Sequence, residues 1–406
     1  MRELVLLTAE FPYGNVTEPF LETEIEVLSE RFDRILVLPS HQQPRVRELP
    51  GNAELVRMDW LSEPSAGSRR AAILSRRSLQ VARSTIAGAS SLAPYARAPR
   101  MYADNLARNL LKLRSLRKFV SERSLQRAVF YDYWFENSTL ALALLRRDGA
   151  IRAAVCRAHN FDVYDDRWAS GAVPFRAAKA EWLDAIYVVS DSGRRYLAER
   201  VPRMREKLEL HRLGVRDPGR VGPERCEDGV PLIVTCGRLV ASKRIHLVPS
   251  VLKALARPVR WIHLGDGPEL DRITSEASRL GVDVSWEIRG QLDNRDVLAF
   301  YASQHVDALL SVSTSEGLPV SMMEAQSYGI PIVARAVGGV AEIVSERTGV
   351  LLPGAAGVGE IAAGLASALE PGRFEPGVIR EHFHDQFDSD VNYGEFADAL
   401  VARLPD

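Results

Sequence analysis

The chain has 406 residues, and its 52 basic and 53 acidic residues leave a formal net charge of −1. That length exceeds one ordinary hydrophobic core and predicts two domains of roughly 200 residues each. The near-zero net charge argues against general nucleic-acid binding, and no stretch approaches the roughly 20 apolar residues of a membrane span. The three cysteines, Cys156, Cys226 and Cys236, indicate reduced thiols in a cytoplasmic protein rather than a disulfide framework.

The N-terminal half alternates apolar strands with helices. A strand at Leu4–Leu7, a helix at Phe20–Arg31 and a strand at Ile35–Leu38 form one strand–helix–strand unit, the building block of a parallel sheet. Further strands are predicted at Ala128–Tyr131, Ala153–Arg157, Ala185–Val189 and Leu208–Arg212. In open sheets of this kind, ligands bind where strands end and helices begin. Gly14 follows the first strand, where it would either let a phosphate approach the backbone or serve as an ordinary turn glycine.

Residues 67–120 differ in character because they are basic, and Asp104 is their only acidic residue. Two helices are predicted, at Arg69–Ala87 and Arg100–Val120, with a loop at Gly88–Pro99 between them. The leucines of the second helix keep a helical period, so one of its faces is apolar. Such a basic amphipathic pair either rests on an anionic membrane surface or forms a solvated helical face.

His159 lies at the end of the strand Ala153–Arg157, beside the polar turn that follows it. A histidine in that place is either a site residue or a structural one.

Residues 216–229 have no periodicity and are rich in proline, glycine and charge, so we predict the interdomain linker there. The first domain is then 1–215 and the second 230–385, which repeats the alternation of strands and helices.

The stretch Ser311–Pro331 contains a strand end, a turn and a helix predicted over Val320–Tyr328. This order makes an anion site, because the free N–H groups and the positive dipole end of the first helical turn point at the ligand. Glu316 lies in the turn and Glu324 one turn inside the helix. They would accept hydrogen bonds from ligand hydroxyls, or they are surface glutamates favoured near a helix N-terminus.

A second candidate for anion binding follows the strand Leu232–Cys236. Gly237 opens the turn, and Arg238 and Lys243 come directly after it. Arginine offers a planar fork of donors and lysine a point charge, so the two would clamp a phosphate. The alternative is ordinary surface charge.

Three segments together resemble glycosyltransferase family 4, whose members are retaining enzymes that use nucleotide-sugar donors. The segments are EGLPVSMMEA with Glu316 and Glu324, GRLVASK with Arg238 and Lys243, and RAHNFDVY with His159. The resemblance implies the GT-B fold, in which two Rossmann-like, doubly wound parallel-sheet α/β domains face each other across a cleft. It also implies that residues 386–406 form a C-terminal helix that crosses back to the first domain. The chain departs from the family pattern at Asn160 and Arg244, where glycine is common, and in having only Gly14 in the first loop.

The resemblance also implies residue roles. Glu316 would meet the hydroxyls of the donor sugar, Glu324 the ribose, and the Gly317–Leu318 backbone the phosphate or sugar. Gly237, Arg238 and Lys243 would hold the diphosphate, with Gly14 facing it from the first domain. The backbone at Gln291 would meet the base, and His159 would lie near the donor sugar.

The function expected from these roles is transfer of a sugar with retention, with His159, Glu316, Arg238 and Lys243 as the catalytic residues. The nucleotide-sugar is a co-substrate, and neither a cofactor nor a metal is expected. The acceptor would be a saccharide or a lipid-linked glycan of the cell envelope. Residues 67–120 would give a cytoplasmic protein peripheral contact with the inner face of the membrane. A sugar-nucleotide epimerase, a phosphorylase and a non-catalytic nucleotide-sugar-binding protein remain as alternatives.

Overall fold

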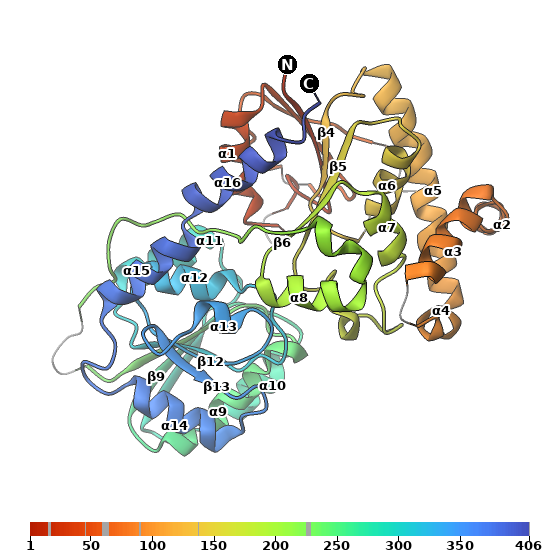
Figure 1. Cartoon of the computed structure of the whole chain (residues 1–406). Coiled ribbons are helices and arrows are strands. Elements are labelled where there is room, and N and C mark those ends of the chain that lie inside the picture. The colour runs from red at the N-terminus through yellow and green to blue at the C-terminus, as the bar shows by residue number, and fades with distance from the viewer. Residues whose placement is uncertain are drawn as a thin grey trace. The chain divides into compact units, whose positions relative to one another are not determined.

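The computed structural model describes residues 1–14, 18–44, 46–58, 65–88, 91–136, 138–224 and 229–405. The chain divides into two compact units. Unit 1 consists of Met1–Arg212 together with Tyr393–Asp406, and unit 2 of Leu213–Asn392. Each unit is a parallel β-sheet with helices on both faces (Figure 1). This is the doubly wound α/β architecture expected from the alternation of strands and helices.

The sheet of unit 1 has seven strands in the order β3-β2-β1-β4-β5-β6-β7, all paired in parallel. The strands are β1 Glu3–Thr8, β2 Arg34–Pro39, β3 Ala53–Leu55, β4 Val129–Asp132, β5 Ala153–Ala158, β6 Ala185–Val188 and β7 Leu208–Leu210. The helices are α1 Leu21–Arg31, α2 Ala66–Ile73, α3 Arg76–Gly88, α4 Ala93–Arg97, α5 Pro99–Glu122, α6 Thr139–Arg147, α7 Arg176–Trp182 and α8 Asp191–Arg200.

Strand β1 shows why helices cover both faces of this sheet. Its central residues are apolar without a break, and successive side chains point to opposite faces. Leu4 and Leu6 pack in a core with α1 and the last part of α16 (Ser389–Val401). Val5 and Leu7 pack in a second core with α5, α6 and α7.

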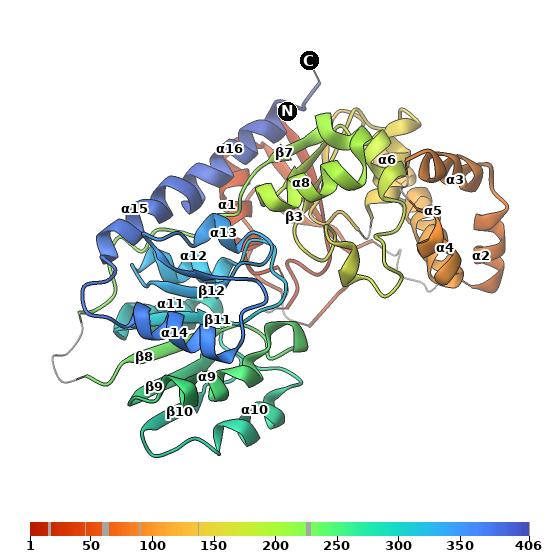
Figure 2. The same cartoon turned by 60° about the horizontal axis from the view of Figure 1, so that its bottom comes forward.

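The basic segment folds differently from the prediction. The helix predicted at Arg69–Ala87 is interrupted, because the Ser75 hydroxyl accepts a hydrogen bond from the Ser78 amide at 3.1 Å and donates one to the Ala72 carbonyl at 2.8 Å. A short helix, α4, also lies inside the predicted loop. Figures 1 and 2 show α2, α3 and α4 beside α5 at one edge of unit 1, and an ion pair between Arg69 and Asp104 joins α2 to α5.

The sheet of unit 2 has six parallel strands in the order β10-β9-β8-β11-β12-β13. The strands are β8 Leu232–Cys236, β9 Val259–Leu264, β10 Val284–Ile288, β11 Ala308–Ser311, β12 Ile332–Arg335 and β13 Gly349–Leu352. The helices are α9 Val248–Leu255, α10 Leu270–Ala277, α11 Asn294–Ser303, α12 Val320–Ser327, α13 Val340–Ile343, α14 Val358–Ala368 and α15 Pro376–Phe387.

The strand order reverses once in each sheet, between β1 and β4 in unit 1 and between β8 and β11 in unit 2. At such a switch point the two following helices lie on opposite faces, and a crevice opens at the carboxyl ends of the strands. The loops after β1 and β4, and those after β8 and β11, are therefore where ligands are expected to bind. Within the described residues, no helix combines the length and the apolar character needed to span a bilayer.

Candidate active site

The loop after β8 is held by close backbone packing against the loop after β9. The Leu239 amide donates to the Asp266 carbonyl at 2.9 Å, and the Glu269 amide donates to the Leu239 carbonyl at 3.1 Å. A Cβ atom at Gly265 would lie only 2.0 Å from the Gly237 carbonyl oxygen, so the loops can meet only where one residue has no side chain. The loop that carries Arg238 and Lys243 is thus fixed by backbone contacts with the loop after β9.

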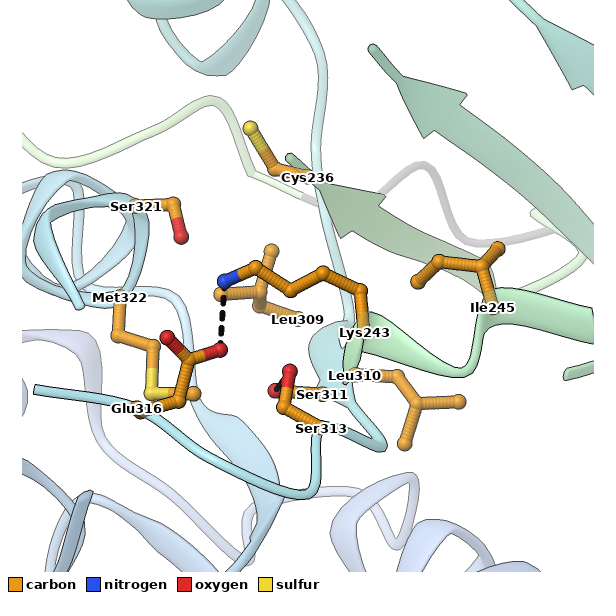
Figure 3. Close-up of a pocket in the computed structure, with 10 residues that line it drawn as sticks. All are labelled: Cys236, Lys243, Ile245, Leu309, Leu310, Ser311, Ser313, Glu316, Ser321 and Met322. Carbon is orange, nitrogen blue, oxygen red and sulfur yellow. Dashed lines mark hydrogen bonds and ion pairs between the residues drawn. The ribbon is translucent and has the colours of Figure 1, made fainter. Parts of the chain in front are cut away.

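The loops after β8 and β11 meet through an ion pair. The Lys243 Nζ atom lies 2.6 Å from Glu316 Oε1, with their side chains 26% and 8% exposed (Figure 3). The Thr314 amide also donates to the Ser242 carbonyl at 2.9 Å, which joins the two backbones. The two segments that the sequence singled out therefore lie side by side at the switch point of unit 2.

A third loop supports the backbone at Glu316. The Gly339 amide, after β12, donates to the Gly317 carbonyl at 2.8 Å. A Cβ atom at Gly338 would lie 1.7 Å from the Glu316 carbonyl oxygen, and this glycine has a φ of +54°. Only glycine allows so close an approach in this conformation. Gly317 and Leu318 are buried, and they lead through Pro319 into α12.

A narrow pocket lies between these loops and the start of α12 (Figure 3). Lys243 and Glu316 point toward each other across it, and Ser321 and Met322 line it from the first turn of α12. The pocket thus combines a cation, a carboxylate and a helix N-terminus. This combination suits a ligand that has both anionic and hydroxyl groups.

Glu324 lies further along α12 and is 7% exposed. Its Oε1 atom accepts a hydrogen bond of 2.5 Å from the Asn294 side-chain amide, at the first position of α11. Burial raises the pKa of Glu324 to about 7, against the opposing effect of that hydrogen bond. A buried carboxylate with one protein donor gains more than an exposed one from a further donor supplied by a ligand.

Residues 223–376 match the sequence model of the family described as glycosyl transferases group 1. WcaL of Escherichia coli K12, assigned as a glycosyltransferase of colanic acid biosynthesis, is 27% identical over 66% of this chain and 69% of its own length. The structure of sucrose-phosphate synthase from Thermosynechococcus elongatus superposes on this chain with a TM-score of 0.74 and 16% identity. The match includes 99% of this chain and 100% of the synthase chain. Residues 223–376 are thus similar to the group 1 glycosyl transferases, and the whole chain has the GT-B fold.

A second solved structure of this glycosyltransferase fold is that of Anabaena HepE in complex with UDP. It covers 99% of the chain, is covered completely, and has a TM-score of 0.67 at 16% identity. At these identities the structural likeness shows the fold alone. The expected two-sheet Rossmann-like fold is thereby confirmed.

The structure brings some of the predicted site residues together and leaves others apart. Lys243 and Glu316 are in direct contact. Arg238 is exposed, and its guanidinium has no ion-pair partner among the described residues. Gln291 is exposed after the edge strand β10, where its side-chain amide donates to the Leu292 carbonyl at 3.1 Å, and it does not line the pocket.

The remaining two predicted residues belong to unit 1. Gly14 has a φ of +67°, and its carbonyl accepts a hydrogen bond of 2.6 Å from Arg47 Nε. His159 is 7% exposed, and its backbone amide donates to Asp162 Oδ1 at 2.8 Å. Both ring nitrogens of His159 are buried and lie beyond hydrogen-bond distance of any described partner, with Nδ1 3.8 Å from Asp162 Oδ2.

Sequence reasoning missed three residues of these sites: Asn294, Glu18 and Trp134. Asn294 comes before Glu324 by thirty positions and looks like an ordinary residue of a first helical turn. No local pattern marks it, because its role depends on how α11 and α12 pack. Glu18 and Trp134 are likewise more than a hundred positions apart, and only the switch point of unit 1 brings them together.

Proposed function

We propose that this chain transfers a sugar from a nucleoside-diphosphate donor to an acceptor hydroxyl with retention of configuration, as in glycosyltransferase family 4. The observation that carries the proposal is the contact of Lys243 with Glu316 at the switch point, beside the N-terminus of α12. That arrangement supplies a cation for a diphosphate and a carboxylate for sugar hydroxyls. Both kinds of group are needed to bind a nucleotide-sugar.

The leaving diphosphate gains negative charge as the glycosidic bond breaks. Lys243, Arg238 and the first N–H groups of α12 would stabilise that charge, and such fixed donors are usually the largest catalytic contribution. In the part of the chain that the structure describes, no three His, Cys, Asp or Glu side chains are gathered in a way that could hold a metal ion. The proposal itself assigns charge neutralisation to the two cations and the helix, without a divalent metal.

Retention requires the acceptor to attack the face that the diphosphate leaves. In this proposal a phosphate oxygen of the departing diphosphate takes the proton of the acceptor hydroxyl, so that the new C–O bond forms as the old one breaks. Glu316 binds hydroxyls of the donor sugar, Glu324 binds the ribose, and the Gly317–Leu318 backbone contacts the phosphate or sugar. His159, in unit 1, acts near the donor sugar.

The acceptor in this proposal is a saccharide or a lipid-linked glycan of the cell envelope. WcaL, the E. coli relative, is assigned to colanic acid biosynthesis. A second support comes from α3, whose exposed face carries Arg76, Leu79, Arg83 and Ile86 at helical spacing. Leu79 is 61% exposed and Ile86 59%. A stripe that mixes arginines with exposed aliphatic side chains favours the surface of an anionic membrane over bulk water.

A donor screen tests the proposed function. The thermal midpoint of the protein should rise with one of uridine, guanosine or adenosine diphosphate, because a ligand that binds the native state stabilises it. The matching nucleotide-sugar is then supplied with a hydroxyl acceptor, and the anomeric configuration of the product is determined by NMR. Inversion would contradict the retaining mechanism. Product formed without an acceptor would indicate an epimerase, and dependence on inorganic phosphate would indicate a phosphorylase.

A further inference from the structure

The loop after β1 in unit 1 is organised around the carboxylate of Glu18. Its two oxygens accept hydrogen bonds from the backbone amides of Ala9, Glu10 and Phe11, at 2.8, 2.9 and 2.7 Å. Glu18 is 2% exposed and has a φ of +55°, which is uncommon for a residue with a side chain. A carboxylate held by three amides in a constrained backbone indicates a position that the surrounding structure strongly determines.

Glu18 also links this loop to the loop after β4. The Trp134 indole N–H donates to Glu18 Oε1 at 2.6 Å. The hydrogen bond crosses the place where the strand order of unit 1 reverses, between β1 and β4. One buried carboxylate therefore joins both loops at this switch point.

Trp134 in turn contacts the imidazole of His159. The centroids of these two rings lie 4.6 Å apart. The centroid of the Tyr133 ring lies 4.7 Å from that of the same imidazole. The imidazole nitrogens have no partner within hydrogen-bond distance among the described residues, although Nδ1 lies 3.8 Å from Asp162 Oδ2. The two aromatic contacts and Asp162, which also accepts from the His159 backbone amide, therefore set the orientation of the ring. Both aromatic rings are tilted against the imidazole, and neither ring nitrogen is occupied by a hydrogen bond within the described residues, so a ligand could still reach one of them.

We propose that Glu18 and Trp134 are positioning residues for His159. Glu18 orients the indole of Trp134, and the indole fixes the imidazole at the end of β5. The inference rests on the proposed function, since His159 matters for turnover only if a donor sugar reaches it. The orientation of His159 by Trp134 can be measured without donor, because all the residues involved belong to unit 1.

The test uses Glu18→Gln, which weakens the amide cluster, and Trp134→Phe, which keeps a ring but removes the indole N–H. Each should lower kcat about tenfold, because small misplacements of a reacting group are costly. The donor KM and the thermal shift with nucleoside diphosphate should stay within twofold of wild type. Trp134→Leu, which removes the ring as well, should lower kcat further.

Proton NMR of the His159 ring gives a readout that needs no donor. Its resonance, assigned by comparison with His159→Gln, should show ring-current shifts in wild type that are reduced in Trp134→Leu. The matched controls are Trp168→Phe, whose indole donates to the Phe161 carbonyl, and Glu30→Gln on the surface of α1, and both should behave as wild type. Circular dichroism verifies that each variant is folded.

Wild-type kcat in Glu18→Gln and Trp134→Phe would overturn the inference, and so would a His159 resonance that Trp134→Leu leaves in place. A wild-type protein that binds none of the nucleoside diphosphates would instead refute the proposed function. In that case the NMR comparison still decides whether Trp134 orients His159.

Discussion

Lys243 Nζ and Glu316 Oε1 lie 2.6 Å apart and join the loops after β8 and β11 at the switch point of unit 2. Each side chain satisfies the charge of the other, so a phosphate that binds Lys243 has to share it with Glu316. The Glu316 carboxylate is thus close enough to Lys243 to weaken phosphate binding. A carboxylate in this place is explained if it binds another part of the ligand. The proposed task is to accept hydrogen bonds from the donor sugar.

That competition gives Glu316→Gln and Lys243→Ala opposite effects on product binding. Glu316→Gln should bind the nucleoside diphosphate more tightly than wild type, because a negative charge beside the phosphate is removed. Lys243→Ala should bind it more weakly. Turnover should fall by about 10²-fold or more in both variants, the usual cost of losing one transition-state contact.

Isothermal titration calorimetry with the nucleoside diphosphate and steady-state kinetics measure the two effects. The control is Lys253→Ala, an exposed lysine of α9 in the same unit. Weaker product binding in Glu316→Gln would contradict the competition, and wild-type turnover in either site variant would refute the assigned roles.

The raised pKa of Glu324 predicts how donor binding depends on pH. Burial raises its pKa to about 7, so it is largely protonated at pH 6 and largely ionised at pH 8. A ligand hydroxyl donates better to the ionised carboxylate, so affinity for the nucleoside diphosphate should rise between pH 6 and pH 8. Two other buried groups of unit 2 titrate outside this window, since burial lowers the pKa of His263 to about 4 and raises that of Cys236 to about 12.

Glu324→Gln should abolish this contribution to the pH dependence while binding more weakly than wild type at pH 8. The terminal phosphate of the ligand also titrates near pH 6, so the comparison is between the two proteins with the same ligand. Parallel pH profiles for wild type and variant would show that Glu324 does not contact the nucleotide.

Much of this site could be predicted because its signals are local. A glycine after an apolar strand, followed by Arg238 and Lys243, is visible in seven residues, and the turn at Glu316 is visible in ten. The alternation of strands and helices then predicts two parallel sheets. What could not be predicted depends on packing between distant segments: Asn294 reaches Glu324 from another helix, and Glu18 reaches Trp134 across the sheet. The interruption at Ser75 was missed because a serine inside a helical pattern is usually neutral, and here its hydroxyl caps the next helix.

The α3 stripe predicts binding to anionic vesicles. The protein should co-sediment with vesicles that contain anionic phosphatidylglycerol at low salt and less so at high salt, because screening weakens charge attraction. Arg76→Glu combined with Arg83→Glu should remove most of the binding. Leu79→Glu should also reduce binding, although both arginines of the stripe keep their charge. Arg203→Glu combined with Arg205→Glu, at an exposed segment of the same unit, is the charge-matched control. If the wild-type protein does not sediment with the vesicles at low salt, the proposed membrane contact is refuted.

The buried ion pair of Glu24 and Arg157 predicts a stability effect in unit 1. Both side chains are 0% exposed, and Arg157 Nη1 lies 2.5 Å from Glu24 Oε2. The guanidinium also lies 4.3 Å from the centroid of the Phe396 ring, so the pair supports the place where α16 packs on the sheet. Glu24→Gln leaves the charge of Arg157 buried without its counter-ion, and breaking such a pair typically costs about 3–5 kcal/mol.

At about 2–4 °C per kcal/mol for a unit of this size, the thermal midpoint should fall by roughly 6 °C or more, as differential scanning calorimetry would show. Glu30→Gln, at the exposed end of α1, should change it little. Adding Arg157→Met to Glu24→Gln should recover much of the loss, because the desolvated charge is then removed altogether. If the double variant is no more stable than Glu24→Gln alone, the loss comes from the packing of Arg157 against Phe396 rather than from its uncompensated charge.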